Sequence, residues 1–350
     1  MNGHILTLSA LCAVLLAGCG KTPAPAPDPD TDPDPIVSTL VKGADISWVT
    51  EMENKGYKFY NAAGQERECT ALMKELGMGA IRLRVWVNPE GGWNGKADVV
   101  AKARRAQALG LKLLIDFHYS DTWADPGHQT VPAAWKGKDA AAMAAAVKEH
   151  TQDVLQALKA AGVDVAWVQV GNETTQGMLW ESGKVSGQNP GEFVRYFHAG
   201  REAVKAVYPQ AQVILHIDNG WKMTTLDWFL GLMKAKSLDY DILGLSLYPS
   251  YWDGKAYPDW TTKVKQFVTN LPALKERYGK PVMLVEFGMP ASQPDKAKAA
   301  LQYLIDNTKQ YNYFQGIFYW EPESEHGRNG YDYGAFSSGR PTVALDPFAN

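Results

Sequence analysis

The chain has 350 residues, of which 45% are hydrophobic, and its formal net charge is −3. This charge balance shows neither the basic footprint of a nucleic-acid-binding protein nor a basic patch for a membrane surface. Residues 36–350 form a segment long enough to bury a large hydrophobic core.

The first residues predict export. Residues 1–18 are apolar over too short a stretch to span a bilayer, and they end in the sequence LAGC (16–19). This pattern indicates a lipoprotein signal peptide with lipidation at Cys19. A cleaved soluble export signal or an uncleaved short anchor is the alternative, because the first residues carry only His4 where Lys or Arg is expected. Residues 19–35 alternate Pro and Asp, which predicts an extended, disordered tether.

Cysteine usage supports a folded domain that needs no cross-links. Cys12 would leave with the signal peptide and Cys19 would take the lipid, so Cys69 alone remains in the folded part. An internal disulfide and a cysteine metal cluster are therefore excluded. We expect a monomer anchored through Cys19 to the cell envelope, with the outer membrane of a Gram-negative bacterium as the expected place, facing either the surface or the periplasm.

Short apolar runs alternate with helical patterns along residues 36–350. The expected strands are residues 43–49, 80–87, 112–120, 165–173, 212–218, 241–249, 281–288 and 316–322, and helical periodicity fills the segments between them. Eight strands alternating with helices predict a single (β/α)8 barrel, the TIM barrel. A doubly wound open sheet is the alternative, but the Gly-rich turn that it needs after the first strand is missing.

Two glutamates end separate expected strands. Glu173 closes the fourth strand, and Glu286 lies near the end of the seventh. Active sites of this fold lie at the C-terminal strand ends, and a pair of carboxylates there is what glycoside hydrolysis requires. Either glutamate alone could instead cap a helix or pair with an arginine.

Strand alternation places Arg82, Arg84 and Trp86 on the face of the second strand that points into the barrel. Buried arginines need charged partners, and Glu286 or Asp45 are the natural ones. We therefore expect the pKa of Glu286 to be depressed by a neighbouring arginine. The pKa of Glu173 should be raised, because apolar strand neighbours and a second carboxylate surround it.

Histidines and tryptophans allow two interpretations each. His118 and His216 could be core residues or metal ligands, but the first strand lacks the His and Asp pair of barrel metal hydrolases, so we expect no metal and no cofactor. Four tryptophans follow strands three to six and could pack in the core or stack on sugar rings; they are Trp123, Trp180, Trp221 and Trp252.

The segment DFHYSDTWADPGHQTVPAAW (116–135), with GADISW, IRLRVWV, VQVGNE and FYWEP, resembles the arabinogalactan endo-β-1,4-galactanases of glycoside hydrolase family 53. This family belongs to the clan of retaining (β/α)8 hydrolases. The resemblance implies an endo-acting enzyme that cleaves β-1,4-galactan or type I arabinogalactan, a side chain of pectin, by double displacement.

The resemblance also implies roles for single residues. Glu173 would be the acid/base and Glu286 the nucleophile, with Tyr248 and Arg84 orienting Glu286 and keeping it ionised. Asn172 would hold the sugar 2-hydroxyl, Trp320 would lie beneath the cleaved sugar, and His118 and His216 would line the cleft. The full expected set of substrate-binding residues is Asp45, Arg84, Trp86, His118, Asn172, His216, Asp218, Tyr248 and Trp320.

Two segments depart from the family pattern. After strand eight the chain reads EPESEHGRNGYDYG (321–334) where many relatives continue Glu-Pro-Ala-Trp, and residues 288–301 form a short loop where some bacterial members bind calcium. We therefore expect no bound calcium and altered distant sugar subsites. Two rival functions stay open: another retaining endo-glycanase of the clan, acting on mannan, xylan or β-glucan, and a non-catalytic surface glycan-binding lipoprotein.

Overall fold

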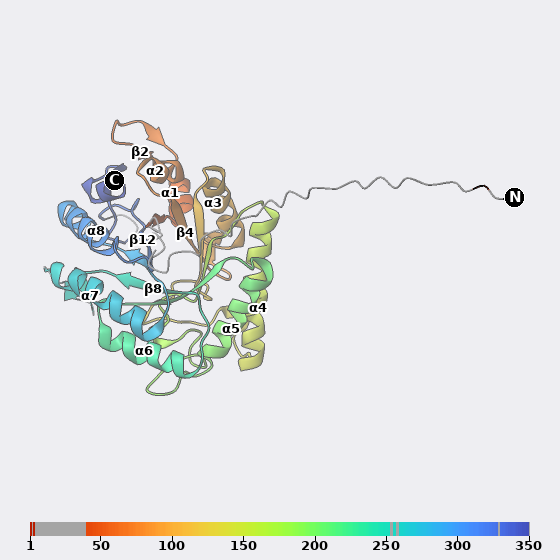
Figure 1. Ribbon diagram of the computed structural model, residues 1–350. Helices are drawn as coiled ribbons and strands as arrows, with labels where there is room; N and C mark the ends of the chain where they lie inside the picture. The colour runs from red at the N-terminus through yellow and green to blue at the C-terminus, as the bar shows by residue number, and fades with distance from the viewer. Residues whose placement is uncertain (2, 4–39, 253–254, 257–258, 328–329, 350) are drawn as a thin grey trace. The chain divides into compact units, whose positions relative to one another are not determined.

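The computed structural model describes residues 1, 3, 40–252, 255–256, 259–327 and 330–349. A single compact unit spans Val37–Asn350 (Figure 1). Apart from Met1 and Gly3, the expected signal peptide lies outside the described residues, and so do the expected lipidation site Cys19 and the expected tether. Within the described part of the chain, every helix is too short or too polar to span a bilayer.

Eight parallel strands close into a barrel, as predicted, and each expected run supplies one strand. In chain order they are β1 (Val41–Asp45), β4 (Ala80–Val85), β5 (Lys112–Phe117), β6 (Trp167–Val170), β7 (Gln212–Ile217), β8 (Ile242–Leu247), β11 (Val282–Phe287) and β12 (Phe314–Trp320). Each strand pairs with the next, and β1 pairs with both β4 and β12, which closes the ring.

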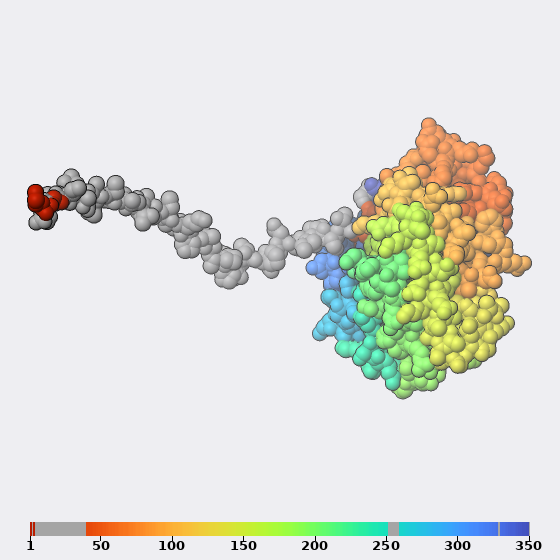
Figure 2. All heavy atoms as spheres, turned by 90° about the vertical axis from the view of Figure 1, so that its right-hand side faces the viewer, coloured from red at the N-terminus to blue at the C-terminus, as the bar shows by residue number. Residues whose placement is uncertain are grey.

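Helices surround the barrel. They are α1 (Val49–Asn54), α2 (Cys69–Glu75), α3 (Lys96–Ala108), α4 (Ala140–Ala160), α5 (Phe193–Val207), α6 (Met223–Ala235), α7 (Thr261–Tyr278) and α8 (Pro294–Thr308). Helix α5 turns Phe193, Tyr196 and Phe197 inward and leaves its charged residues outside, as an amphipathic barrel helix should. Figure 2 shows the face on which α4, in yellow-green, and α5, in green, lie against each other.

The loops outside the barrel strands and helices contain short two-stranded ribbons and 3-10 helices. Three two-stranded ribbons are β2 (Phe59–Tyr60) with β3 (Glu66–Arg67), β9 (Tyr251–Trp252) with β10 (Lys255–Ala256), and β13 (Phe336–Ser337) with β14 (Arg340–Pro341). Four 3-10 helices are η1 (Glu90–Gly92), η2 (Ala133–Trp135), η3 (Thr174–Gln176) and η4 (Val343–Phe348). The ribbon β13–β14 follows the loop after β12, which is where the chain departs from the family pattern.

Two separate apolar layers explain how the sequence builds a packed interior. The outward sides of the strands join the helices in one large core, whereas a smaller cluster fills the inside of the barrel, and this inner cluster comprises Ala80, Leu114, Trp167, Ile214, Ile242, Met283, Val285 and Phe318. On β4, alternation from Ala80 in the inner cluster places Arg82 and then Arg84 further along the same inward face. The inside of the barrel is thus apolar at one end and charged toward the C-terminal ends of the strands.

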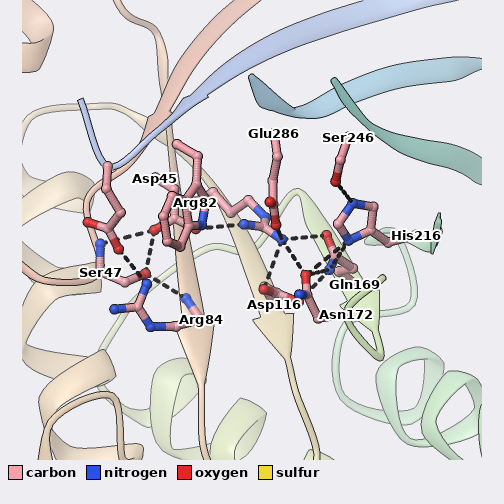
Figure 3. A network of polar contacts seen from close by, with 12 residues as sticks. Asp45, Ser47, Arg82, Arg84, Asp116, Gln169, Asn172, His216, Ser246 and Glu286 are labelled. Carbon is pink, nitrogen blue, oxygen red and sulfur yellow. Dashed lines mark hydrogen bonds and ion pairs between the residues drawn. The ribbon is translucent and has the colours of Figure 1, made fainter. Parts of the chain in front are cut away.

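Strand β11 departs from strict alternation at the position that matters most. Met283 and Val285 belong to the inner cluster, so regular alternation would turn Glu286 outward. The pairing of β11 with β8 shifts register between Leu284 and Glu286, a β-bulge-like irregularity. Such irregularities re-aim side chains, and here Glu286 points toward Arg82 inside the barrel (Figure 3).

Candidate active site

A cavity of about 480 Å³ opens at the C-terminal ends of the strands. Its lining comes from the loops after β5, β6, β7, β8 and β12: Pro126, Glu173, Asp218, Asn219, Ser246, Tyr248, Gly330, Tyr331, Asp332 and Tyr333. Glu173, Asp218 and Tyr248 were expected here from the sequence. The cavity therefore lies where a barrel of this type holds its active site.

Arg82 is the centre of the polar network beneath this cavity (Figure 3). Its guanidinium lies 2.7 Å from Asp45, 2.9 Å from Asp116 and 2.9 Å from Glu286. Arg82 is fully buried, and these carboxylates satisfy the need of its buried charge for opposite charge. The predicted pairing of an inward arginine with Asp45 and Glu286 is confirmed for Arg82.

Arg84 does not orient Glu286, contrary to the role expected from the resemblance. Its Nη1 pairs with Glu321 at the end of β12, and its guanidinium lies 4.3 Å from the ring centre of Trp123 and 5.1 Å from that of Trp48. Two residues along a strand advance the chain by about 6.6 Å, which is why the neighbouring inward arginine has other partners. The arginine that contacts Glu286 is Arg82.

The pKa of Glu286 is raised to about 7, mainly by burial, so the expectation of a depressed pKa is wrong. Arg82 acts in the opposite direction, as does the Tyr248 hydroxyl, which donates a hydrogen bond of 2.9 Å to Oε2 of Glu286. Asp116 and Asp45 raise the pKa further and also share the charge of Arg82. Because the guanidinium is shared among three carboxylates, it does not offset the desolvation of Glu286.

The pKa of Glu173 is raised well above its usual range, as predicted, by burial and by the neighbouring charge of Glu286. Glu286 has the positive charge of Arg82 at 2.9 Å, whereas the charges that act on Glu173 are those of other carboxylates, so Glu286 ionises first as the pH rises. One carboxylate then carries a charge while the other holds a proton. This division of states is the one that an acid and a nucleophile require.

His216 contacts the backbone of Glu173 and lies deeper in the barrel than the cavity lining. Its Nδ1 accepts a hydrogen bond from the backbone N–H of Glu173 at 3.2 Å, which leaves Nε2 as the donor toward Ser246 Oγ at 2.8 Å. Burial and the charge of Arg82 lower the pKa of His216 well below its usual range, which agrees with a neutral ring. Ser246 in turn bonds the Glu173 carboxyl. His216 is fully buried and lies beneath the cavity lining.

Asn172 and His118 are also buried supports rather than wall residues of the cavity. The Asn172 Oδ1 accepts a hydrogen bond from Arg82 at 3.0 Å, and its Nδ2 donates to the carbonyl of Ala124 at 2.8 Å. His118 bonds Asp116 at 3.0 Å and lies within 3.3 Å of the indole nitrogen of Trp86.

The expected aromatic residues separate into two groups. Trp123 and Trp320 pack edge to face at 5.8 Å between ring centres and, with Trp48 and Trp86, surround Arg84. Trp180 lines a different cavity, and Trp221 packs on the main core. The side chain of Trp252 lies outside the described part of the structure.

Sequence reasoning missed the residues that follow β12. Tyr331 packs against Trp320 with 4.5 Å between ring centres, and Tyr331, Asp332 and Tyr333 line the cavity. Gly288 permits this arrangement, because a Cβ there would lie 2.6 Å from atoms of both Tyr248 and Tyr331. Gln169 was also missed, although it lies two residues after Trp167 on the same inward face of β6 and bonds Arg82.

The described residues offer no group of three or more His, Cys, Asp or Glu side chains arranged to hold a metal ion. Asp45, Asp116 and Glu286 are instead directed at the Arg82 guanidinium, which supplies the positive charge of this region.

Comparison with known proteins gives consistent matches. Residues 41–315 match the model of glycosyl hydrolase family 53. The chain is 34% identical over 314 residues to the arabinogalactan endo-β-1,4-galactanase of Humicola insolens, covering 82% of this chain and 91% of the relative. It is 32% identical over 310 residues to a probable arabinogalactan endo-β-1,4-galactanase A of Neosartorya fischeri, covering 81% and 84%.

Solved structures agree. A fungal β-1,4-galactanase superimposes with a TM-score of 0.79 at 32% identity, covering 88% of this chain and 98% of the other. The catalytic domain of an Ignisphaera aggregans family 53 protein gives a TM-score of 0.78 at 26% identity, covering 90% and 97%. A family 10 endoxylanase gives a TM-score of 0.61 at 12% identity, covering 89% and 96%, which is a likeness of fold alone.

Proposed function

The chain belongs to glycosyl hydrolase family 53, and on that basis we propose that it is an endo-acting β-1,4-galactanase that cleaves within the galactan chains of arabinogalactan. The observation that carries the proposal is a pair of glutamates at the C-terminal strand ends: Glu173 lines the cavity, and Glu286 is held by Arg82 and by the cavity residue Tyr248. The rival activities on mannan, xylan or β-glucan are not favoured, because the relatives of the same family are galactanases.

We assign the nucleophile to Glu286 and the acid/base to Glu173. Glu286, held by Arg82 and Tyr248, attacks the anomeric carbon while Glu173 gives its proton to the departing glycosidic oxygen. The glycosyl–Glu286 ester is then hydrolysed by a water that Glu173 deprotonates. Two inversions leave the anomeric configuration unchanged.

Neutralisation of Glu286 during attack alters the field around Glu173. Its charge is one cause of the raised pKa of Glu173, and that charge disappears when the ester forms. The pKa of Glu173 then falls, which prepares the group to act as a base in the second step. The same carboxyl can thus donate a proton first and accept one later.

Reducing-sugar release from linear β-1,4-galactan tests the proposal, with xylan, mannan and cellulose as comparison polymers. We expect activity on galactan, and a loss of at least about a thousandfold in Glu286→Gln, because removal of a covalent nucleophile abolishes the main route. Glu149→Gln, an exposed substitution on α4, should keep full activity. NMR of the first product should show the β-anomer; the α-anomer would contradict double displacement.

For the N-terminal segment we propose lipidation at Cys19 and attachment to the bacterial outer membrane, supported by the LAGC sequence and the Pro- and Asp-rich stretch after it. The anchor would hold a monomeric enzyme near polymeric substrate. Incorporation of labelled palmitate into the full chain but not into Cys19→Ser would support this assignment, and equal labelling of both would oppose it.

A further inference from the structure

A second cavity, of about 520 Å³, lies between the loops that follow β5 and β6. It adjoins the catalytic cavity along the chain: Pro126 lines the catalytic cavity, and Gly127 lines the second one. Both loops leave the C-terminal ends of barrel strands, so the two cavities lie on the same face of the barrel. The β6 loop also carries Glu173, which places the second cavity on the side of the proton donor.

Two lysines give the second cavity an excess of positive charge. Lys136 and Lys138 line it and are exposed, and neither has a carboxylate within 4.0 Å among the described residues. The nearby carboxylates are already engaged, since Asp125 pairs with His128 and Glu181 pairs with Lys184.

The carboxylate of Asp139, the residue after Lys138, also has a hydrogen-bond partner. Asp139 caps helix α4 by accepting a hydrogen bond of 2.8 Å from the backbone N–H of Ala142. Lys136 and Lys138 therefore keep ammonium groups without a carboxylate partner among the described residues, and such groups attract an anion.

The lysines project from a fixed turn rather than from a loose loop. Trp135 is buried against Tyr119 and His150, and its burial anchors the turn. The backbone N–H of Lys136 bonds the carbonyl of Ala133, and that of Lys138 bonds the carbonyl of Trp135. The main chain of Lys136 and Lys138 is therefore fixed before a ligand binds, which reduces the conformational entropy lost on binding.

Trp180 adds an aromatic wall, and Gln129 links the cavity to the catalytic groups. The indole nitrogen of Trp180 bonds the carbonyl of Gln176 at 2.9 Å, which fixes the ring, and its backbone N–H bonds Gln129 at 2.8 Å. The Gln129 Nε2 donates to the carbonyl of Asn172, next to Glu173, at 2.8 Å. The Oε1 of this buried amide has no hydrogen-bond partner among the described residues.

We propose that the second cavity is a subsite for a carboxylate-bearing sugar, placed on the leaving-group side of the cleavage point. Lys184 Nζ lies over one face of the Trp180 ring, 4.5 Å from its centre, so the other face would take a sugar ring, and Lys136 and Lys138 offer ammonium groups to its carboxylate. The proposal rests on the proposed function, because it treats the cavity as an extension of the polysaccharide cleft. It directs the enzyme toward galactan segments that are attached to acidic polysaccharide.

The test measures binding of oligogalacturonate, whose rings carry carboxylates, and of its uncharged methyl ester to the soluble domain by titration calorimetry. The Lys136→Gln/Lys138→Gln double variant should weaken binding of the acid by about tenfold, because two exposed charge contacts are lost. Binding of the acid should also weaken with added salt. Trp180→Ala should weaken binding of both the acid and the ester.

The matched control is Lys265→Gln/Lys296→Gln, which removes the same charge from exposed positions on α7 and α8. The control should bind oligogalacturonate like the unaltered protein and should hydrolyse short neutral galacto-oligosaccharides at the unaltered rate. Equal weakening in the control, equal affinity for acid and ester, or no binding at all would overturn the subsite. Failure to hydrolyse galactan would instead overturn the proposed function, whatever the binding result.

Discussion

The two inward arginines of β4 lie two residues apart and occupy contrasting surroundings. Arg82 lies among carboxylates, in contact with Asp45, Asp116 and Glu286. Arg84 is paired with the single carboxylate Glu321 and is otherwise enclosed by aromatic rings, and its Nε and Nη2 have no hydrogen-bond partner among the described residues. Both side chains are fully buried.

The contrast separates two uses of a buried positive charge. Around Arg82 the charge is shared, which leaves Glu286 with a raised pKa of about 7 while still making it easier to ionise than Glu173. Around Arg84 the charge holds Trp48, Trp123 and Trp320 together through cation–π contacts. The first region sets the proton affinity of Glu286, and the second sets the positions of the tryptophan rings around Arg84.

Arg82→Met should have the largest effect, because it leaves several buried carboxylates without their shared cation. We expect the free energy of unfolding to fall by about 3–5 kcal/mol, as when one partner of a buried ion pair is removed. The pKa of Glu286 should rise above its value of about 7, so activity at neutral pH should be lost. Urea denaturation and the pH profile of kcat/KM measure the two effects. The acid limb is the fall of kcat/KM toward low pH. A stable Arg82→Met variant whose acid limb lies at the same pH as that of the unaltered protein would show that Arg82 does not control the ionisation of Glu286.

Arg84→Met serves as the matched comparison and should have an intermediate effect. Burial already raises the pKa of its partner Glu321, so this carboxyl can take up a proton when Arg84 is lost. We expect unfolding free energy to fall by about 2 kcal/mol, chiefly from lost cation–π contacts. Tryptophan fluorescence should change, and kcat/KM should fall with an unchanged acid limb. If the acid limb of Arg84→Met moved as far as that of Arg82→Met, Arg84 would also control the ionisation of Glu286, and the proposed difference between the two arginines would be wrong.

Strand order and the main contents of the cavity were predictable from sequence, because they follow from periodicity. Apolar runs of strand length recur between helical segments, and residues at their C-terminal ends, Glu173 and Tyr248 among them, line one cavity. Alternation also placed Arg82 and Arg84 inside the barrel. It could not tell which arginine reaches Glu286, because that depends on the stagger of β4 against β11 across the barrel.

Other features needed the structure for physical reasons. The register shift before Glu286 is a local irregularity that has no sequence period. The raised pKa of Glu286 results from a balance between burial and a shared charge, and a sequence shows neither the depth of burial nor the number of carboxylates around Arg82. Tyr331 reaches the site through a loop whose path depends on the close approach that Gly288 allows. These features arise from packing between segments distant in the chain.

Tyr248→Phe should give the smallest effect and the most specific one. It removes the hydroxyl that stabilises ionised Glu286 but leaves the ring in place. In the proposed mechanism, activity requires ionised Glu286 and protonated Glu173, so the acid limb of kcat/KM would report Glu286 and the alkaline limb would report Glu173. A hydrogen bond to a charged group contributes about 1.5 kcal/mol, and one pKa unit corresponds to about 1.4 kcal/mol, so the acid limb should move up by about one pH unit.

The direction in which the acid limb of Tyr248→Phe moves shows whether Tyr248 acts on the pKa of Glu286 or only on the packing of the site. Loss of a hydrogen bond to the ionised form makes Glu286 harder to ionise, and therefore the midpoint rises from about 7 while the rate at the optimum changes little. Gly288→Ala provides the packing control, since its new methyl group would press on the Tyr248 ring and on the Tyr331 hydroxyl without removing the Tyr248 hydroxyl. It should lower the rate at every pH, with the acid limb in place. An acid limb in Tyr248→Phe that stays fixed or moves down would show that Tyr248 acts on substrate and leaves the ionisation of Glu286 to Arg82 alone.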